Sequence, residues 1–258
     1  MCHGGVLMQK IEEYVFEKYE YFFYFKGLIK DRGVKAFYQF ANRYLYRSFS
    51  RSLIKRYAPK GVGLEIGVGS RTISPTRRTI LSDAFSCHGV KDSIAKVLFN
   101  ALDIPYQNHS FSFVLSEHTL EHITNPIKAL KEWMRVLKPG GVIILILPHY
   151  KRNNDIHRPR TTLAHCIEDY GRNVSANDST HFEEWYQLVV QKGLMPKHYA
   201  HQNKEELLSQ ASIHHHVWNQ SDISELLIYL GNEIVFVDDK LYDRRDSFIV
   251  IAQTPFQV

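Results

Sequence analysis

The chain has 258 residues, a hydrophobic content of 44% and a formal net charge of +5, which suit one soluble globular domain with additions. The longest apolar run, Val142–Leu147, is far shorter than the roughly 20 residues of a membrane span, and Met1–Gly5 lacks the charged region and apolar stretch of a signal peptide. Cys2, Cys87 and Cys166 form no CxxC motif and no even set, which predicts a cytoplasmic protein without disulfides.

The N-terminal region carries the excess positive charge. Residues 10–60 contain twelve Lys or Arg against five Asp or Glu, and 15 of the 30 Tyr and Phe. Apolar residues at three- and four-residue intervals predict helices at about 9–29 and 33–57. Four basic residues recur at every fourth position of the second helix: Arg43, Arg47, Arg51 and Lys55.

We therefore predict an N-terminal helical extension, residues 1–60. In one interpretation it packs its aromatic side chains on the main domain, with solvated charges. In the other it forms a lid whose basic stripe contacts an anionic acceptor, or whose residues 10–57 contact a membrane surface. The second interpretation would place the protein peripherally at the inner membrane surface.

A short apolar strand that ends in an acid is followed by a glycine loop within residues 61–70. Two alternate glycines after an acid let the backbone turn sharply and lie against a ligand. The loop contains Glu65, Gly67, Gly69 and Ser70. A second strand, residues 79–83, ends in Asp83, which is placed to bind the hydroxyls of a ribose. An NAD-binding loop, or a turn without a ligand, would show the same residues.

The next elements continue an alternating α/β order. Strands are predicted at 95–99 and 111–116, and Pro126 opens a helix that ends at Leu137. A turn, Lys138–Gly141, then leads into the apolar strand 142–147.

On these residues, the stretch from about 61 to 148 resembles the class I S-adenosylmethionine-dependent methyltransferases, and among them the type-11 group. The resemblance implies a doubly wound, Rossmann-like α/β fold whose seven-stranded sheet has an antiparallel last strand, with S-adenosylmethionine as cofactor. It implies a set of cofactor-binding residues: Glu65, Gly67, Gly69, Ser70, Asp83, Asn100, Ala101 and Glu117. The chain departs from the family pattern at three positions, Arg71, Asn100 and Ser112, where Gly, Asp and Asp are common.

His118 and His122 lie four residues apart with Glu121 between them, a spacing that also suits a metal. The family resemblance argues against a metal here, so none is predicted. His122 is interpreted as part of a helix start. His118 is a candidate catalytic base, because it follows the carboxyl end of a strand.

A polar, cation-rich loop begins after Pro148, where this topology places a chain segment over the cofactor. Further helices are predicted at about 161–170, 181–192 and 221–230, and closing strands at 234–237 and 248–251. We therefore predict a methyltransferase domain at 61–258 with a helical cap inserted at about 150–220.

The cap resembles a subset of type-11 enzymes associated with carbohydrate and surface-polysaccharide biosynthesis. A sugar hydroxyl is a poor nucleophile, so its methylation needs a base, and histidine titrates near neutral pH. His149 and His181 are the predicted bases. Arg158 and Arg160 are predicted to grip a phosphate or carboxylate of the acceptor, and His216 to contact the acceptor. A divalent metal held by His181, His216 and an acid stays open as an alternative.

The sequence thus predicts transfer of a methyl group from S-adenosylmethionine to an oxygen of an anionic or sugar-containing acceptor, foremost a hydroxyl of a glycan or glycolipid precursor. A small metabolite or an RNA nucleotide is the alternative acceptor, since nucleic acid would also suit the basic extension. A non-catalytic scaffold or activator that binds S-adenosylmethionine is the alternative of another class. Leu120–His122 and Lys138–Gly141 count against an NAD-dependent oxidoreductase. The oligomeric state does not follow from the sequence.

Overall fold

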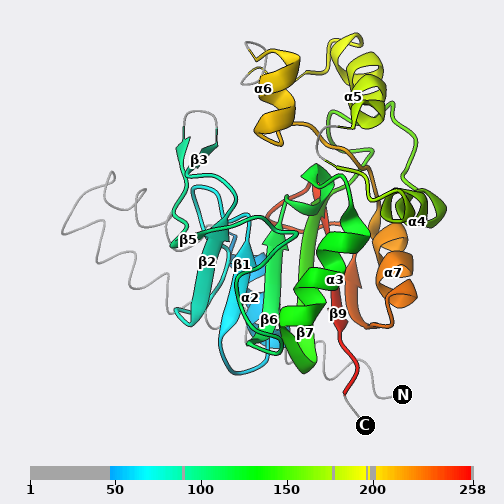
Figure 1. Ribbon diagram of the computed structural model, residues 1–258. Helices are drawn as coiled ribbons and strands as arrows, with labels where there is room; N and C mark the ends of the chain where they lie inside the picture. The colour runs from blue at the N-terminus through cyan, green and yellow to red at the C-terminus, as the bar shows by residue number, and fades with distance from the viewer. Residues whose placement is uncertain (1–46, 89–90, 176–177, 196, 198–201, 257–258) are drawn as a thin grey trace. The chain divides into compact units, whose positions relative to one another are not determined.

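Seven strands form one sheet: β1 (Gly63–Ile66), β2 (Thr79–Asp83), β5 (Val97–Leu98), β6 (Phe111–Glu117), β7 (Leu137–Pro148), β8 (Glu233–Asp238) and β9 (Ser247–Gln253). Their order is β5-β2-β1-β6-β7-β9-β8 (Figure 1). β1, β2, β5, β6 and β7 run parallel, and β9 pairs antiparallel with both β7 and β8. The predicted doubly wound sheet with an antiparallel last strand is confirmed.

This computed structural model describes residues 47–88, 91–175, 178–195, 197 and 202–256. Residues 49–258 form one compact unit. The predicted helix 9–29, Arg43 and most of the predicted helix 33–57 lie outside the described residues. The end of the latter is α2 (Ser48–Tyr57). None of the helices in the described ranges is long and apolar enough to cross a membrane.

Alternating side chains of the central strands face two separate cores, because successive residues of a strand point to opposite sides. On β7, Ile143, Leu145 and Leu147 join the core beneath α3 (Pro126–Val136) and α7 (Gln220–Tyr229). On the opposite face, Ile144 and Ile146 pack in the core that contains Ile54 of α2. The strands at the middle of the sheet are therefore apolar on both faces, as a parallel sheet covered by helices requires.

The chain between the strands differs from the prediction in three places. The predicted strand 95–99 shortens to the two residues of β5, and a small antiparallel ribbon precedes it, β3 (Cys87–His88) and β4 (Lys91–Asp92), which was not predicted. The predicted turn Lys138–Gly141 is the start of β7, because Leu137 already pairs with Phe111 and a register shift absorbs the glycines.

The segment between β7 and α7, residues 149–219, is called the cap segment here. It contains α4 (Leu163–Gly171), α5 (Ser179–Trp185), the π-helical turn η2 (Tyr186–Val190) and α6 (Lys204–Ser209), of which α6 was not predicted. Figure 1 shows α5 and α6 beyond the carboxyl ends of the strands, with α4 beside α7. A small core joins the two outer helices: Phe182, Trp185, Val189, Leu207 and Ile213.

Candidate functional site

A pocket of about 1030 Å³ lies at the carboxyl ends of β1, β2 and β6, with the cap segment forming its other wall. The chain passes from β1 outward to β2 and β5, and then returns to β6 on the other side of β1. Such a reversal of strand order opens a crevice above the sheet, which is where ligands bind in doubly wound folds. The topology therefore fixes this pocket as the candidate site.

The loop after β1 gives the pocket a floor made of backbone. Gly67 and Gly69 have φ angles of +72° and +56°, in the left-handed region that side chains disfavour. A Cβ on Gly67 would lie 2.0 Å from the Thr119 hydroxyl, whereas a Cβ on Gly69 would meet no protein atom within 4 Å. Both glycines line the pocket, so the loop leaves open space for a ligand directly beside Gly69.

Asp83 at the end of β2 ties this loop in place. Its Oδ2 accepts hydrogen bonds from Gly69 N (2.9 Å) and Ser93 Oγ (3.1 Å), and its Oδ1 from Ala84 N (2.8 Å). A ribose hydroxyl would bind this carboxylate by replacing one of these three donors. Ser93 is the one that donates through its side chain. Asp83 lines the pocket, as a ribose-binding acid must.

Glu65 lies under the loop and does not line the pocket. Its carboxylate accepts hydrogen bonds from Thr72 Oγ1, Ile73 N and Ser74 N. Burial raises the pKa of Glu65 to about 7, although these hydrogen bonds act in the opposite direction. The predicted contact of Glu65 with the cofactor is therefore replaced by support of residues 72–74, while Ser70 does line the pocket.

Asn100, Ala101 and Leu102 form the pocket wall beyond β2. Asn100, predicted to bind the cofactor, accepts a hydrogen bond from Leu102 N at its Oδ1 (2.9 Å), so this oxygen already takes part in a local turn. Trp133 Nε1 donates to the Ala101 carbonyl at 2.9 Å and fixes the wall to α3.

Two residues at the end of β6 are held by Arg244. Its guanidinium donates to Glu117 Oε1 and to His118 Nδ1, each at 3.1 Å. Because arginine only donates, His118 Nδ1 is an acceptor, so Nε2 carries the proton and donates to Ser247 Oγ at 2.7 Å. His118 lines the pocket with a strained φ of +52°, but both its ring nitrogens are engaged. The structure thus gives His118 no free nitrogen for the predicted role as a base.

The two leading base candidates lie away from the pocket wall. His149 faces Asp239, with Nε2 3.5 Å from Oδ1, and burial lowers its pKa. His181 lies beside Asp169, with Nε2 3.3 Å from Oδ2. Neither histidine lines the pocket, and neither does His216.

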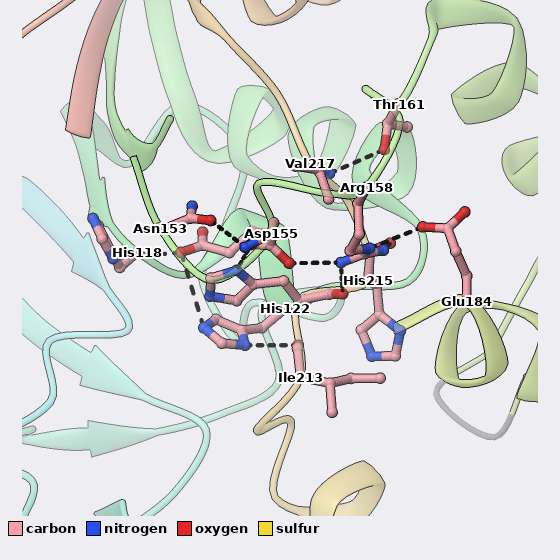
Figure 2. Close-up of polar contacts among 12 residues, drawn as sticks. His118, His122, Asn153, Asp155, Arg158, Thr161, Glu184, Ile213, His215 and Val217 are labelled. Carbon is pink, nitrogen blue, oxygen red and sulfur yellow. Dashed lines mark hydrogen bonds and ion pairs between the residues drawn. The ribbon is translucent and has the colours of Figure 1, made fainter. Parts of the chain in front are cut away.

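Arg158, predicted to grip the acceptor, is instead buried at the centre of the cap segment (Figure 2). It donates to Asp155 Oδ1 at 3.0 Å, to Glu184 Oε1 at 2.8 Å, and to the carbonyls of His214 and His215 at 2.7 and 3.0 Å. The planar guanidinium of Arg158 thus directs its hydrogen-bond donors to other groups of the protein.

Arg160 is half-exposed outside the pocket and pairs with Asp222 at 2.8 Å. It therefore does not contact a ligand in this pocket, contrary to its predicted role.

His214 is the histidine that sequence reasoning missed. It lines the pocket, and its Nδ1 lies 2.5 Å from Asp155 Oδ2. Burial alone would lower the pKa of His214, but the Asp155 carboxylate overcomes this effect and raises it. Likewise, the cations His214 and Arg158 lower the pKa of Asp155 against the effect of burial. Asp155 therefore holds Nδ1 of the ring, which leaves Nε2 as the nitrogen for a ligand.

Glu121 lies buried behind the histidines that line the pocket. Its Oε1 is 3.7 Å from His118 Nδ1 and 3.9 Å from His122 Nε2. Burial raises the pKa of Glu121 to about 7, so this carboxyl is partly protonated near neutral pH. His122, which lines the pocket, has its Nδ1 2.8 Å from the Ile213 carbonyl oxygen.

Comparison with known proteins supports a specific family for the centre of the chain. Residues 68–145 match the family model described as a methyltransferase domain. An uncharacterized protein from Methanocaldococcus jannaschii is 38% identical over 108 residues, which are 40% of this chain and 52% of that protein. Ajmaline N-methyltransferase from Rauvolfia serpentina is 35% identical over 81 residues, 31% of this chain and 28% of the enzyme.

The chain spans about half or less of the length of these curated relatives. Other relatives are named as a C-methyltransferase of ubiquinone and menaquinone biosynthesis and a tocopherol O-methyltransferase. A solved S-adenosylmethionine-dependent methyltransferase from Methanosarcina mazei aligns with a TM-score of 0.46 at 18% identity, over 80% of this chain and 98% of that one.

The residues at the pocket fit an adenosyl cofactor. The glycine loop leaves room beside Gly69 for close approach of a ligand, and Asp83 presents a carboxylate at the pocket wall. The pocket volume of about 1030 Å³ lies at the upper end of ordinary ligand pockets, enough for a cofactor and an acceptor. The match of residues 68–145 to a methyltransferase domain and the residues at this pocket together point to S-adenosylmethionine as the cofactor.

Proposed function

We propose that this protein transfers the methyl group of S-adenosylmethionine to a hydroxyl of a polar acceptor, foremost a glycan or glycolipid precursor. S-adenosylmethionine, when bound, supplies an electrophilic methyl group. The observation that carries the proposal is the His214–Asp155 pair, which lies on the cap side of the same pocket as the glycine loop. Such a pair assists a hydroxyl acceptor, because a proton must leave the oxygen as it is methylated.

His214 is suited to accept that proton through Nε2. Asp155 holds the other ring nitrogen and stabilises the imidazolium that forms, as an orienting carboxylate does in other acid–base pairs. Asp155 is itself fixed by Arg158, so the pair has a defined position. Holding acceptor and donor aligned contributes the larger share of the rate, and the base adds to it.

The cap side of the pocket supports a hydroxyl-rich acceptor. Its lining contains amide and hydroxyl side chains that donate and accept hydrogen bonds: Asn153, Asn154, Ser209 and Ser212. Arg152 also lines this side but pairs with Asp239 at 3.0 Å. The other arginine of the pocket lining, Arg244, pairs with Glu117 at 3.1 Å. Because both arginines are engaged by carboxylates of the protein, the wall favours a neutral sugar face over a phosphate.

Replacement of His214 by alanine is expected to lower kcat by about 10²-fold or more, the usual contribution of a general base, with little change in cofactor affinity. Because a base must be deprotonated and Asp155 raises the pKa of His214, the wild-type rate should fall as the pH decreases through a value above 6.5. That acidic limb should be absent from His214→Ala. The rate is measured as release of S-adenosylhomocysteine with a panel of sugars, nucleotide sugars and amines.

His149→Ala is the matched control, since it removes a histidine of the same region that does not line the pocket. It should keep the acidic limb and a near-normal kcat. Loss of the limb in His149→Ala but not in His214→Ala would overturn the assignment of the base. Methylation of amines alone would exclude the hydroxyl acceptor, and cofactor binding without turnover of any acceptor would favour the non-catalytic alternative.

A further inference from the structure

Four side chains that no part of the proposed reaction uses meet inside the cap segment: His165, Asp169, His181 and His216. Each offers one ligand atom, and these atoms all lie within 4.8 Å of one another. Asp169, His181 and His216 are buried, with relative exposures of 2%, 6% and 1%. His165 is the outermost of the four, with 44% of its side chain exposed.

The carboxylate of Asp169 lies at the centre of the group. Its Oδ2 is 3.1 Å from His165 Nε2, 3.3 Å from His181 Nε2 and 3.9 Å from His216 Nε2. Four ligand atoms at about 2.0–2.1 Å from a tetrahedral Zn²⁺ are separated by roughly 3.4 Å. The observed separations around Oδ2 therefore bracket the spacing that a four-coordinate zinc site requires.

Two ligand atoms of this group have no hydrogen bond to any residue that the structure describes: Asp169 Oδ2 and His181 Nε2. Buried polar atoms are nearly always paired, so two such atoms side by side call for a ligand, an ion or water. His216 Nε2 also lies 3.2 Å from the Thr124 carbonyl oxygen, and an ion at the centre would replace that contact.

The local sequence brings these side chains together from three segments. His165 and Asp169 are four residues apart in α4 and thus share one face of the helix. His181 lies in the first turns of α5, and His216 lies in the stretch that leads from α6 to α7. The apolar core that joins α5 and α6 is small, so an ion that links these segments would add stability that this core alone does not supply.

We propose that His165, Asp169, His181 and His216 bind a Zn²⁺ ion that fastens α4, α5 and the segment before α7 to one another. Zn²⁺ suits a donor set of three imidazole nitrogens and one carboxylate oxygen, whereas Mg²⁺ and Ca²⁺ prefer oxygen ligands alone. Four protein ligands close the coordination sphere, as in structural sites. None of the four side chains lines the pocket, so the ion does not contact the acceptor.

The site is tested on the full chain, purified without a histidine tag, stripped with a chelator, incubated with Zn²⁺ and dialysed. Elemental analysis should find roughly one zinc ion per chain, and thermal unfolding should show a higher Tm with the ion than without it. Co²⁺ in place of Zn²⁺ should show the intense visible bands of a tetrahedral site. Because none of these readouts needs an acceptor or a cofactor, they are independent of the proposed methyl transfer.

Two ligand variants and a control localise the ion. His165→Ala removes the half-exposed ligand and should leave the fold intact, yet lower zinc affinity by at least about tenfold. Asp169→Asn should do the same and, like His165→Ala, lose the zinc-dependent rise in Tm. His157→Ala, an exposed histidine of the same segment, should bind zinc as the wild type does.

A wild-type protein that retains no zinc and whose Tm ignores both zinc and chelator would overturn the site. So would ligand variants that keep wild-type zinc stoichiometry and the wild-type cobalt spectrum. If Asp169→Asn does not fold, His165→Ala and the cobalt spectrum decide the question.

Discussion

Replacing Arg158 with methionine is expected to lower the free energy of unfolding by about 3–5 kcal/mol, the usual effect of removing one partner from a buried, hydrogen-bonded ion pair. Its side chain is 1% exposed and lies against Asp155, which is 2% exposed. The substitution also removes the donors to the carbonyls of His214 and His215. Since Arg158 connects Asp155, Glu184 and the segment that carries His214, kcat should fall together with stability.

Arg160→Met provides the control for Arg158→Met. Arg160 is 43% exposed, pairs with Asp222 and lies 5.7 Å from the centroid of the Tyr150 ring. Exposed ion pairs contribute about 0–1 kcal/mol. Urea unfolding of the two variants should therefore differ by several kcal/mol. Equal losses in both variants would mean that Arg158 is not the connection described here.

Substitution by alanine is expected to reduce mainly thermal stability at Gly67 and mainly cofactor affinity at Gly69. At Gly67 the left-handed backbone costs about 1–2 kcal/mol, and a methyl group 2.0 Å from Thr119 Oγ1 adds an overpacking cost of about 1–3 kcal/mol. Gly67→Ala should therefore lower the Tm strongly. At Gly69 the backbone cost is similar, but the methyl group meets no protein atom within 4 Å.

Because Gly69 lines the pocket, its new methyl group would enter the space that the cofactor needs. Gly69→Ala should thus lose about tenfold or more in affinity for S-adenosylhomocysteine, equivalent to at least about 1.4 kcal/mol, with a smaller loss of Tm than Gly67→Ala. Thermal unfolding with and without the ligand measures both effects. Unchanged ligand affinity in Gly69→Ala would show that the cofactor does not approach this loop.

The sheet was predictable from the sequence because its determinants are local. The β1 loop carries two glycines that the backbone needs at φ +72° and +56°, and the apolar run in β7 marks a strand covered on both faces. The topology then places every parallel strand end at one edge, which predicted Asp83 and Gly69 at the pocket. The use of Asn100 Oδ1 by Leu102 N two residues later is also local, and an Asx turn would have anticipated it.

The roles of the cap histidines were not predictable in this way, because they depend on contacts between distant segments. His214 meets Asp155 across 59 positions, and Arg158 reaches the His214 carbonyl across 56. No periodicity encodes such pairs. His149 follows a strand and looks well placed for catalysis, but its ring turns to Asp239, beyond β8. The residue types thus marked histidines and arginines of the cap as candidates, but the structure was needed to show which partner each of them contacts.

Calorimetric titration of the full chain with S-adenosylmethionine tests most directly the claim that the pocket above β1, β2 and β6 is an adenosyl-cofactor site. The predicted result is a single saturable site for which S-adenosylhomocysteine competes and which NAD does not occupy. Asp83→Ala should weaken binding at this site by about 1.5–3 kcal/mol, the strength of hydrogen bonds to a charged group. Absence of binding, binding of NAD instead, or an affinity unchanged in Asp83→Ala would contradict it.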